Sequence, residues 1–244
     1  MNLIIDIGNT RAKTAVMCGD AVVVQHTVER LDPLWLDQLI DRYDAISQAI
    51  VCSTREDAKP IAEQLRRRLP MVVDFSAAST PIPLANHYAT PATLGADRLA
   101  AAVGAAMLYP GRDLLIVDFG TAITIDLVEG GAYKGGNISP GVKMRFRALH
   151  DYTARLPLAD VTDERLRFGN TTLSAIEQGV MQGVANEIEG YIGAFSEKND
   201  KISTIFTGGD AKYFVKRIKN AIFADCELVV CGLNRILDYN ANKD

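Results

Sequence analysis

The stretch LIIDIGNT at residues 3–10 decides the fold, because a close copy of it, LIVDFGTA, returns at residues 115–122. Each copy is a short apolar run that ends in Asp-x-Gly and is followed by small or hydroxyl side chains. Further alternating apolar residues follow, which is typical of two strands joined by a tight turn with Gly at its tip. The two copies lie close to half a chain apart and predict two similar domains. Chance similarity is the alternative, since Asp-x-Gly is a common sequence.

The remaining pattern predicts an α/β fold of two duplicated domains with mixed sheets flanked by helices. The stretch PGRD at residues 110–113 is the expected seam, which places the domains at residues 1–112 and 113–244. Helices are expected at residues 55–69, 96–108, 172–195 and 211–219, and strands at residues 49–53, 71–75, 202–207 and 227–230.

Composition excludes several classes of protein. The 244 residues include 26 Lys+Arg and 30 Asp+Glu, a net charge of -4, and 48% are hydrophobic, which excludes intrinsic disorder. The mild acidity and the lack of a long basic run argue against a nucleic-acid partner. The longest apolar stretch, residues 99–108, is half of the roughly 20 residues that a membrane span needs. The N-terminus lacks the basic region of a signal peptide, so we expect a cytoplasmic protein with no membrane partner.

The four cysteines, Cys18, Cys52, Cys226 and Cys231, include no CxxC pair and are expected to be reduced structural thiols. Cys226 and Cys231 lie five residues apart in an apolar stretch. On a strand this odd offset would place them on opposite faces, where they could not share a metal ion.

Both Asp-x-Gly turns carry groups that suit phosphate. In the first turn, backbone N–H groups at Gly8 and Asn9 and the Thr10 hydroxyl can face phosphate oxygens, and Lys13 can add a positive charge. The Asp6 carboxylate suits an ion or its water shell. The second turn repeats this chemistry with Asp118 and Thr121. A plain hairpin with a capped Asp explains the first turn equally well.

Two glycine-rich stretches in the second half are also candidates. GGNISPG at residues 135–141 predicts a loop whose backbone approaches a ligand closely. TGGDA at residues 207–211 follows a predicted strand and precedes a predicted helix, so its Gly208-Gly209 turn can admit a flat purine or ribose. The alternative is an ordinary strand-to-helix turn with Asp210 as N-cap.

The stretch GADR at residues 95–98 is a candidate for acid–base chemistry. Asp97 stands beside Arg98 at a predicted helix start, and Tyr88 lies upstream. A carboxylate there can accept a proton, and the guanidinium can recognise an anion. The alternative is an N-cap Asp with a surface Arg.

In their order along the chain, these motifs resemble the type III pantothenate kinases of the actin/Hsp70/sugar-kinase superfamily. The resemblance covers nearly the whole chain, and GADR followed by DFGTA is its most specific part. It implies ribonuclease-H-like (actin-like ATPase) domains and ATP-dependent phosphorylation of pantothenate to 4′-phosphopantothenate, the first step towards coenzyme A. The motifs that carry it are DIGNTRAK, YATPATLGADR, DFGTAITID, GGNISPG, NTTLSAIEQG, TGGDA and LVVCGL.

The resemblance also implies a role for each site residue. Asp97 would be the general base, and Asp118 would bind a monovalent cation, K+ or NH4+, that acts with ATP and Mg2+. A homodimer would complete the pantothenate site at its interface. The cofactor-binding residues would be Asp6, Ile7, Gly8, Asn9, Thr10, Arg11, Ala12, Lys13, Thr121, Gly208 and Gly209, and the pantothenate-binding residues would be Tyr88, Gly95, Ala96, Asp97, Arg98 and Thr172. Spacing to Ala175 and Gly179 favours Thr172 over Thr171.

Two other functions compete with this interpretation. A sugar kinase of the same superfamily would also carry a catalytic Asp, but the short chain leaves little room for an elaborate sugar domain. A regulatory protein could bind ATP or DNA without catalysis. The net charge of -4 and the lack of a basic helix disfavour direct DNA binding, and salt-dependent DNA binding would distinguish the two classes.

Overall fold

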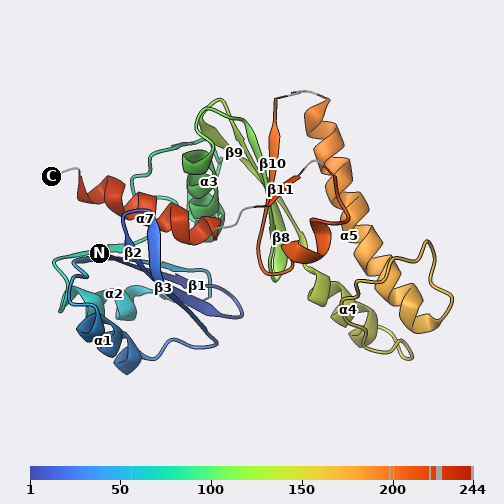
Figure 1. Ribbon diagram of the computed structural model, residues 1–244, viewed down its shortest axis with the longest axis horizontal. Helices are drawn as coiled ribbons and strands as arrows, with labels where there is room; N and C mark the ends of the chain where they lie inside the picture. Colours follow the sequence, from blue (N-terminus) through green and yellow to red (C-terminus); the bar gives the residue numbers. More distant parts are fainter. Residues whose placement is uncertain (56, 198, 200, 220, 224–226, 243–244) are drawn as a thin grey trace. The chain divides into compact units, whose positions relative to one another are not determined.

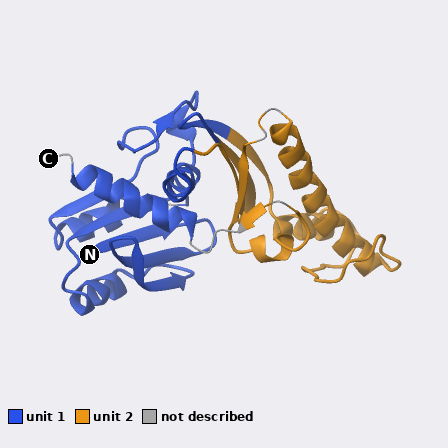
Figure 2. Cartoon of the chain, turned by 45° about the horizontal axis from the view of Figure 1, so that its top comes forward, with its two compact units in different colours: residues 1–111, 128–135, 226–244 blue, residues 112–127, 136–225 orange. Residues whose placement is uncertain are grey.

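A computed structural model describes residues 1–55, 57–197, 199, 201–219, 221–223 and 227–242 (Figure 1). The chain forms two compact units, of which unit 1 comprises residues 1–111, 128–135 and 226–244 and unit 2 comprises residues 112–127 and 136–225 (Figure 2). Two sheets with flanking helices confirm the predicted α/β class. None of the helices in the described part of the chain is long and apolar enough to cross a membrane.

The sheet of unit 1 is built around its first strand. β1 pairs antiparallel with β2 and parallel with β4, so the sheet is mixed. All six residues of β1 are buried, because helices cover both faces of the sheet. The strand order is β3-β2-β1-β4-β5, with β1 (Asn2–Ile7), β2 (Ala12–Cys18), β3 (Ala21–Val28), β4 (Gln48–Ser53) and β5 (Met71–Asp74).

Alternation along β1 separates two faces with different partners. Leu3, Ile5 and Ile7 point to one face and pack with apolar residues of α1 (Pro33–Arg42) and α2 (Lys59–Arg66). Asp6 points to the opposite face, which α3 (Ala96–Leu108) and α7 (Leu228–Ala241) cover. On that face the Asn2 side-chain amide donates a hydrogen bond of 2.7 Å to Asn234 of α7.

Helices α3 and α7 touch through their backbones. A Cβ atom on Gly104 of α3 would overlap with the carbonyl oxygen of Leu228, and one on Gly232 of α7 would overlap with that of Ala100. Interiors are packed too tightly to admit an extra methyl group without displacement. The two glycines therefore set how closely α7 approaches α3.

The second sheet has its apolar core in unit 2. Phe119 at the end of β7 makes an edge contact with Phe206 at 5.0 Å and stacks on Phe214 at 4.8 Å between ring centroids. The strand order is β11-β10-β7-β8-β9-β6, with β6 (Ala85–Asn86), β7 (Leu114–Phe119), β8 (Ala122–Glu129), β9 (Ala132–Pro140), β10 (Ser203–Thr207) and β11 (Ala221–Phe223); the helices are α4 (Val142–Asp151), α5 (Thr172–Ser196) and α6 (Ala211–Phe214), and a 3-10 turn spans Pro91–Thr93.

Most predicted elements are confirmed. The helix expected at 96–108 has those bounds, and the one expected at 172–195 is α5. Strands at 49–53, 71–75 and 202–207 correspond to β4, β5 and β10 within one residue at each end. The helix expected at 55–69 is shorter, because Pro60 occupies the first turn of α2, and the helix expected at 211–219 ends at Phe214.

Two predictions about local structure are wrong. The strand expected at residues 227–230 is instead the first part of the C-terminal helix α7, because its Val-rich start belongs to a helix that packs through Gly232 on α3. The loop expected at residues 135–141 is largely strand β9. Its Gly136 lies against the backbone of β8, where a Cβ would overlap with the Ile125 carbonyl oxygen, so the close approach is between two strands.

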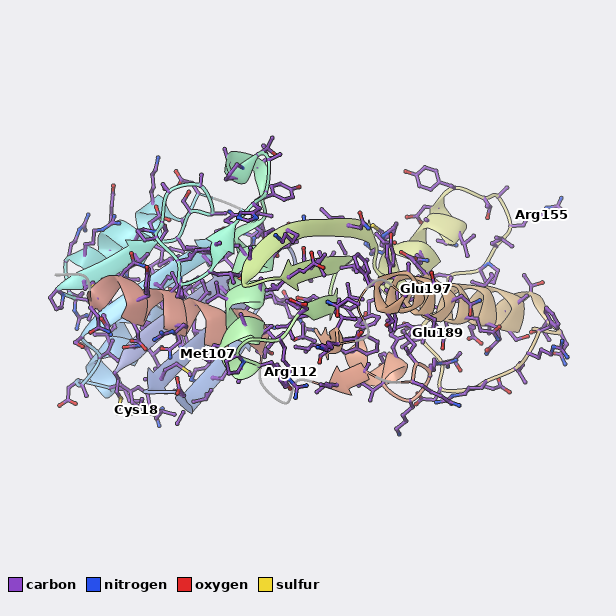
Figure 3. All side chains as sticks on the ribbon, turned by 90° about the horizontal axis from the view of Figure 1, so that it is seen from above. Cys18, Met107, Arg112, Arg155, Glu189 and Glu197 are labelled. Atoms are coloured by element: carbon purple, nitrogen blue, oxygen red, sulfur yellow. The ribbon has the colours of Figure 1, made fainter. Side chains whose placement is uncertain are left out.

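The cysteines lie in different environments. Cys18 is exposed at the end of β2 (Figure 3), whereas Cys52 and Cys231 are buried. Cys231 is in helix α7, so the argument that it occupies a strand face is wrong, and Cys226 lies outside the described residues.

The compact units differ from the predicted domains of residues 1–112 and 113–244. The first crossing between the units, after Gly111, lies at the predicted seam, but residues 128–135 and 226–244 also belong to unit 1. The two duplicated domains with those bounds stay a prediction.

The contact between α3 and α7 generates a stability prediction. We expect Gly232→Ala to lower the free energy of unfolding by about 1–3 kcal/mol, because the new methyl group overpacks the helix contact. Gly193→Ala is the matched control, since Gly193 also lies in a helix but has open space where its Cβ would be. The control should be stabilised by up to about 1 kcal/mol, the difference in helix propensity. Urea unfolding measures both, and equal stability of the two variants would contradict the assigned contact.

Candidate active site

The first Asp-x-Gly turn joins β1 to β2. The Gly8 amide donates a hydrogen bond of 3.0 Å to the Arg11 carbonyl, which closes the turn. Ile7 and Ala12 are buried, whereas the tip formed by Asn9, Thr10 and Arg11 is exposed and can be reached by a ligand. The exposed tip is compatible with both interpretations of this turn, phosphate binding and a plain hairpin.

Lys13 lies beside Asp6 but is engaged elsewhere. The two residues are direct cross-strand neighbours on β1 and β2, so their side chains share a face of the sheet. Lys13 Nζ forms an ion pair of 2.6 Å with Glu227 Oε2, at the residue that precedes α7. Sequence analysis did not predict this partner, because it lies more than 200 positions away along the chain.

The thiol of Cys52 lies within electrostatic reach of three carboxylates. Cys52 is the register partner of Asp6 on the neighbouring strand β4 and is fully buried. Burial raises the pKa of the Cys52 thiol well above its usual value, and the charges of Asp6, Asp97 and Asp74 raise it further. Asp6 and Asp97 therefore both lie close enough to Cys52, at the carboxyl end of the unit 1 sheet, for their charges to favour the protonated thiol.

Asp97 is placed by the glycine that precedes it. The N-cap of α3 is Gly95, and Asp97 lies in the first helical turn, so the alternative that Asp97 is the N-cap is wrong. The Arg98 amide donates a hydrogen bond of 2.8 Å to Asp97 Oδ1. A Cβ on Gly95 would lie 2.7 Å from that same oxygen. The missing side chain at Gly95 therefore leaves the space that the Asp97 carboxylate occupies.

Arg98 is buried, with 6% of its surface exposed, so the alternative of a surface arginine is wrong. Its guanidinium carbon lies 6.0 Å from the centre of the Tyr88 ring, within the range of a cation–π contact. Folding thus brings together two of the predicted pantothenate-binding residues. The Tyr88 ring in turn lies 6.1 Å from the ring of Tyr133, which the sequence did not single out.

A cavity of about 350 Å³ opens in unit 1 beside the start of α3. Gly95 and Ala96 line it, together with the ends of β4 and β5. Its size is sufficient for a small metabolite, since ligand sites span roughly 300–1,000 Å³. Its hydroxyl groups come from Ser53, Thr54, Ser76 and Thr93, and apolar walls come from Phe75, Pro91 and Leu94.

The second Asp-x-Gly turn belongs to unit 2, and the backbones of Gly141 and Gly208 pack against it. The Gly141 amide donates a hydrogen bond of 3.2 Å to the carbonyl of Thr121, whose residue is exposed. Gly208 has φ +93°, and a Cβ there would overlap with Asp118 Oδ1. Gly209 has open space where its Cβ would be. The Gly208 backbone therefore packs directly against the Asp118 carboxylate, at a distance that no residue with a Cβ would allow.

Two neighbouring threonines at the N-terminus of α5 have different environments. Thr171 is the N-cap, and its hydroxyl accepts a hydrogen bond of 3.1 Å from the Ser174 amide. Thr172 is exposed and lines a cavity of about 680 Å³ between α4 and α5.

Asp210, the N-cap of α6, makes no side-chain capping bond, and burial raises its pKa.

A mixed sheet with flanking helices, in which one strand ends in an Asp-x-Gly turn, occurs in each unit and gives the fold of the actin-like class. Solved structures show the same fold. A Baf family protein from Campylobacter jejuni has a TM-score of 0.64 at 23% identity, over 98% of this chain and 99% of that one. A protein from Sinorhizobium meliloti described as a 2-dehydro-3-deoxygalactonokinase has a TM-score of 0.61 at 16% identity, over 99% and 100% of the two chains.

Sequence comparison identifies the family. The family model for type III pantothenate kinase matches residues 2–194. The type III pantothenate kinase of Bacteroides fragilis is 44% identical over 246 aligned positions that cover 100% of both chains. The chain belongs to the type III pantothenate kinase family.

The contact between Gly95 and Asp97 generates a prediction about turnover. We expect Gly95→Ala to lower kcat about 10- to 100-fold, because displacement of a reacting group by about 1 Å can cost that much. Stability should change little, since the displaced atom is the end of a flexible side chain and φ at Gly95 is -57°. Steady-state kinetics and thermal unfolding together test this, and wild-type kcat in a folded variant would contradict it.

Proposed function

We propose that this chain transfers the γ-phosphoryl group of ATP to the primary hydroxyl of pantothenate, with Asp97 as general base. A bond forms between the hydroxyl oxygen and the γ-phosphorus, the bond from that phosphorus to the β,γ-bridging oxygen breaks, and the hydroxyl proton moves to Asp97. The products are 4′-phosphopantothenate, the first intermediate towards coenzyme A, and ADP. The observation that carries the proposal is the Asp97 carboxylate in the first turn of α3, directly after Gly95 and Ala96, which line the cavity.

The arrangement suits the needs of phosphoryl transfer, which depends more on positioning and charge neutralisation than on covalent chemistry. An alcohol is a weak nucleophile, so a carboxylate that accepts its proton is useful. Asp97 is half-buried and held by the Arg98 amide, which fixes its direction. Gly95 and Ala96 belong to the cavity wall, where the pantoyl hydroxyl would lie.

ATP would be bound by both Asp-x-Gly turns. In the first turn the exposed tip would face the phosphates, and Lys13 would exchange its ion pair with Glu227 for phosphate oxygens. In unit 2, Thr121 and the Gly208-Gly209 turn would contact the nucleotide. The positive φ of Gly208 and the open space at Gly209 support this role.

Asp118 would hold the monovalent cation, K+ or NH4+, and Mg2+ would accompany ATP. The fit rests on the carboxylate oxygens of Asp118, which are ligands that hard cations prefer, and on the close approach of the Gly208 backbone to them. Among the described residues, no three His, Cys, Asp or Glu side chains gather to bind a metal. Phosphate and carbonyl oxygens would therefore supply the remaining ligands. When bound, these cations would offset the negative charge of the phosphates.

The carboxylate of pantothenate would pair with Arg98, with Tyr88 beside it and Thr172 as a further contact. We also propose a homodimer that completes this site at its interface, in the cytoplasm. Support comes from the cavity between α4 and α5, which Thr172 lines. Large apolar side chains are exposed on α4, α5 and the segment between them, namely Met144, Tyr152, Leu158, Phe168 and Leu173. A monomer by light scattering that is fully active would contradict the dimer.

The proposed base generates a prediction about Asp97. We expect Asp97→Asn to lose most of kcat, about 100-fold or more, because an amide cannot accept the proton. ATP binding should stay close to wild type, since Asp97 is not among the proposed nucleotide contacts. Kinetics and calorimetric titration with an ATP analogue measure the two effects. Turnover at the wild-type rate would remove Asp97 from the mechanism.

The proposed cation site generates a second prediction. In wild type, replacing K+ with Na+ should abolish most turnover, and in Asp118→Asn the response to K+ should be weakened, because the neutral amide binds a cation less tightly. Thr121→Ser retains the hydroxyl and serves as the control with a normal K+ response. Rates measured across a K+ series test this. An unchanged K+ response in Asp118→Asn would assign the cation to other ligands.

A further inference from the structure

Strand β9 fixes the backbone of Tyr88. The two-residue strand β6 (Ala85–Asn86) pairs parallel with Ala132 and Tyr133 of β9. Immediately after it, the His87 amide donates a hydrogen bond of 2.9 Å to the Tyr133 carbonyl. The Tyr88 amide then donates one of 3.0 Å to Asn86 Oδ1. Tyr88 is therefore attached to β9 although it lies about 45 positions earlier in the sequence.

The ring of Tyr88 is positioned by two residues of the same strand. Tyr133 is fully buried, and its ring lies 6.1 Å from that of Tyr88 at an interplanar angle of 43°. Gly135 follows two positions later with φ +117°, and a Cβ there would lie 3.3 Å from Cδ2 and 3.5 Å from Cε2 of Tyr88. A side chain at position 135 would thus strain the backbone and push the ring by a few tenths of an ångström.

The ring in turn lies against a buried cation. The Arg98 guanidinium carbon is 6.0 Å from the centre of the Tyr88 ring, and Arg98 is 6% exposed. The face of an aromatic ring stabilises a desolvated guanidinium more strongly than an exposed one. Displacement of the ring would therefore change the position that the guanidinium prefers.

We propose that Gly135 is a positioning residue for pantothenate binding: the absence of a side chain there sets the Tyr88 ring and, through it, the Arg98 guanidinium. This inference rests on the proposed function, in which Tyr88 and Arg98 contact pantothenate. Gly135 is the first glycine of GGNISPG, a stretch that the sequence predicted to be a loop close to a ligand. On this inference Gly135 instead affects substrate affinity indirectly, through the Tyr88 ring.

The test compares glycines that share a positive φ. Gly135→Ala should raise the Kd and KM for pantothenate about tenfold, with kcat and the KM for ATP close to wild type. Gly130→Ala is the matched control, because Gly130 has φ +58° in the β8–β9 turn and open space where its Cβ would be. Gly135→Asn places the same Cβ atom with a different side chain, and thermal unfolding together with the KM for ATP shows whether each variant is folded. Calorimetry in the presence of an ATP analogue gives Kd directly.

A double-mutant cycle with Tyr88→Ala separates this role from a general structural one. If Gly135 acts through the Tyr88 ring, Gly135→Ala causes no further loss of pantothenate affinity once the ring is absent. Additive losses, wild-type affinity in the Gly135 variants, or an equal loss in Gly130→Ala would each overturn the inference. An unchanged pantothenate Kd in Tyr88→Ala would overturn the proposed role of Tyr88 in the function as well. A loss in Tyr88→Ala without one in Gly135→Ala or Gly135→Asn would overturn this inference alone.

Discussion

The backbone contact between α3 and α7 is the constraint on which the arrangement of unit 1 depends. Gly104 and Gly232 let the two helices touch, and both helices cover the face of the sheet to which Asp6 points. The N-terminus of α3 is thereby held at the edge of the sheet where β1 and β4 end. Because Asp97 and Arg98 lie in the first turn of α3, the packing of a C-terminal helix determines where the proposed base and the proposed carboxylate ligand stand.

This geometry concentrates negative charge at the carboxyl end of the unit 1 sheet. Asp6, Asp74 and Asp97 are close enough to Cys52 for their charges to raise its pKa, so the carboxyl end of the sheet accumulates negative charge around a neutral thiol. ATP would bring further negative charge to the same region. Lys13, after leaving its ion pair with Glu227, would add one positive charge and would offset only part of it. Bound cations would offset the remaining negative charge, which is the role proposed for Mg2+ and for the monovalent ion at Asp118.

Features encoded by neighbouring residues could be predicted from the sequence. The Ala-rich helix α3 and the two Asp-x-Gly turns have local signals, and the ordered motifs identified the family. Features that depend on register could not be predicted: Cys52 beside Asp6 follows from the pairing of β1 with β4, and Tyr88 beside Gly135 follows from the pairing of β6 with β9. The Val-rich start of α7 has the sequence pattern of a strand as well as of a helix. Only the contact with α3, which the sequence does not show, favours the helix.

Phosphorylation of pantothenate at the expense of ATP is tested most directly by ADP release from Mg-ATP. The purified protein is assayed with pantothenate, with a panel of sugars and with no acceptor, and the product is identified by mass spectrometry. We expect ADP release that requires pantothenate, together with one phosphoryl group added to pantothenate per ADP formed. ADP release that depends on a sugar instead, or ATP binding with no turnover on pantothenate in K+ buffer, would contradict it.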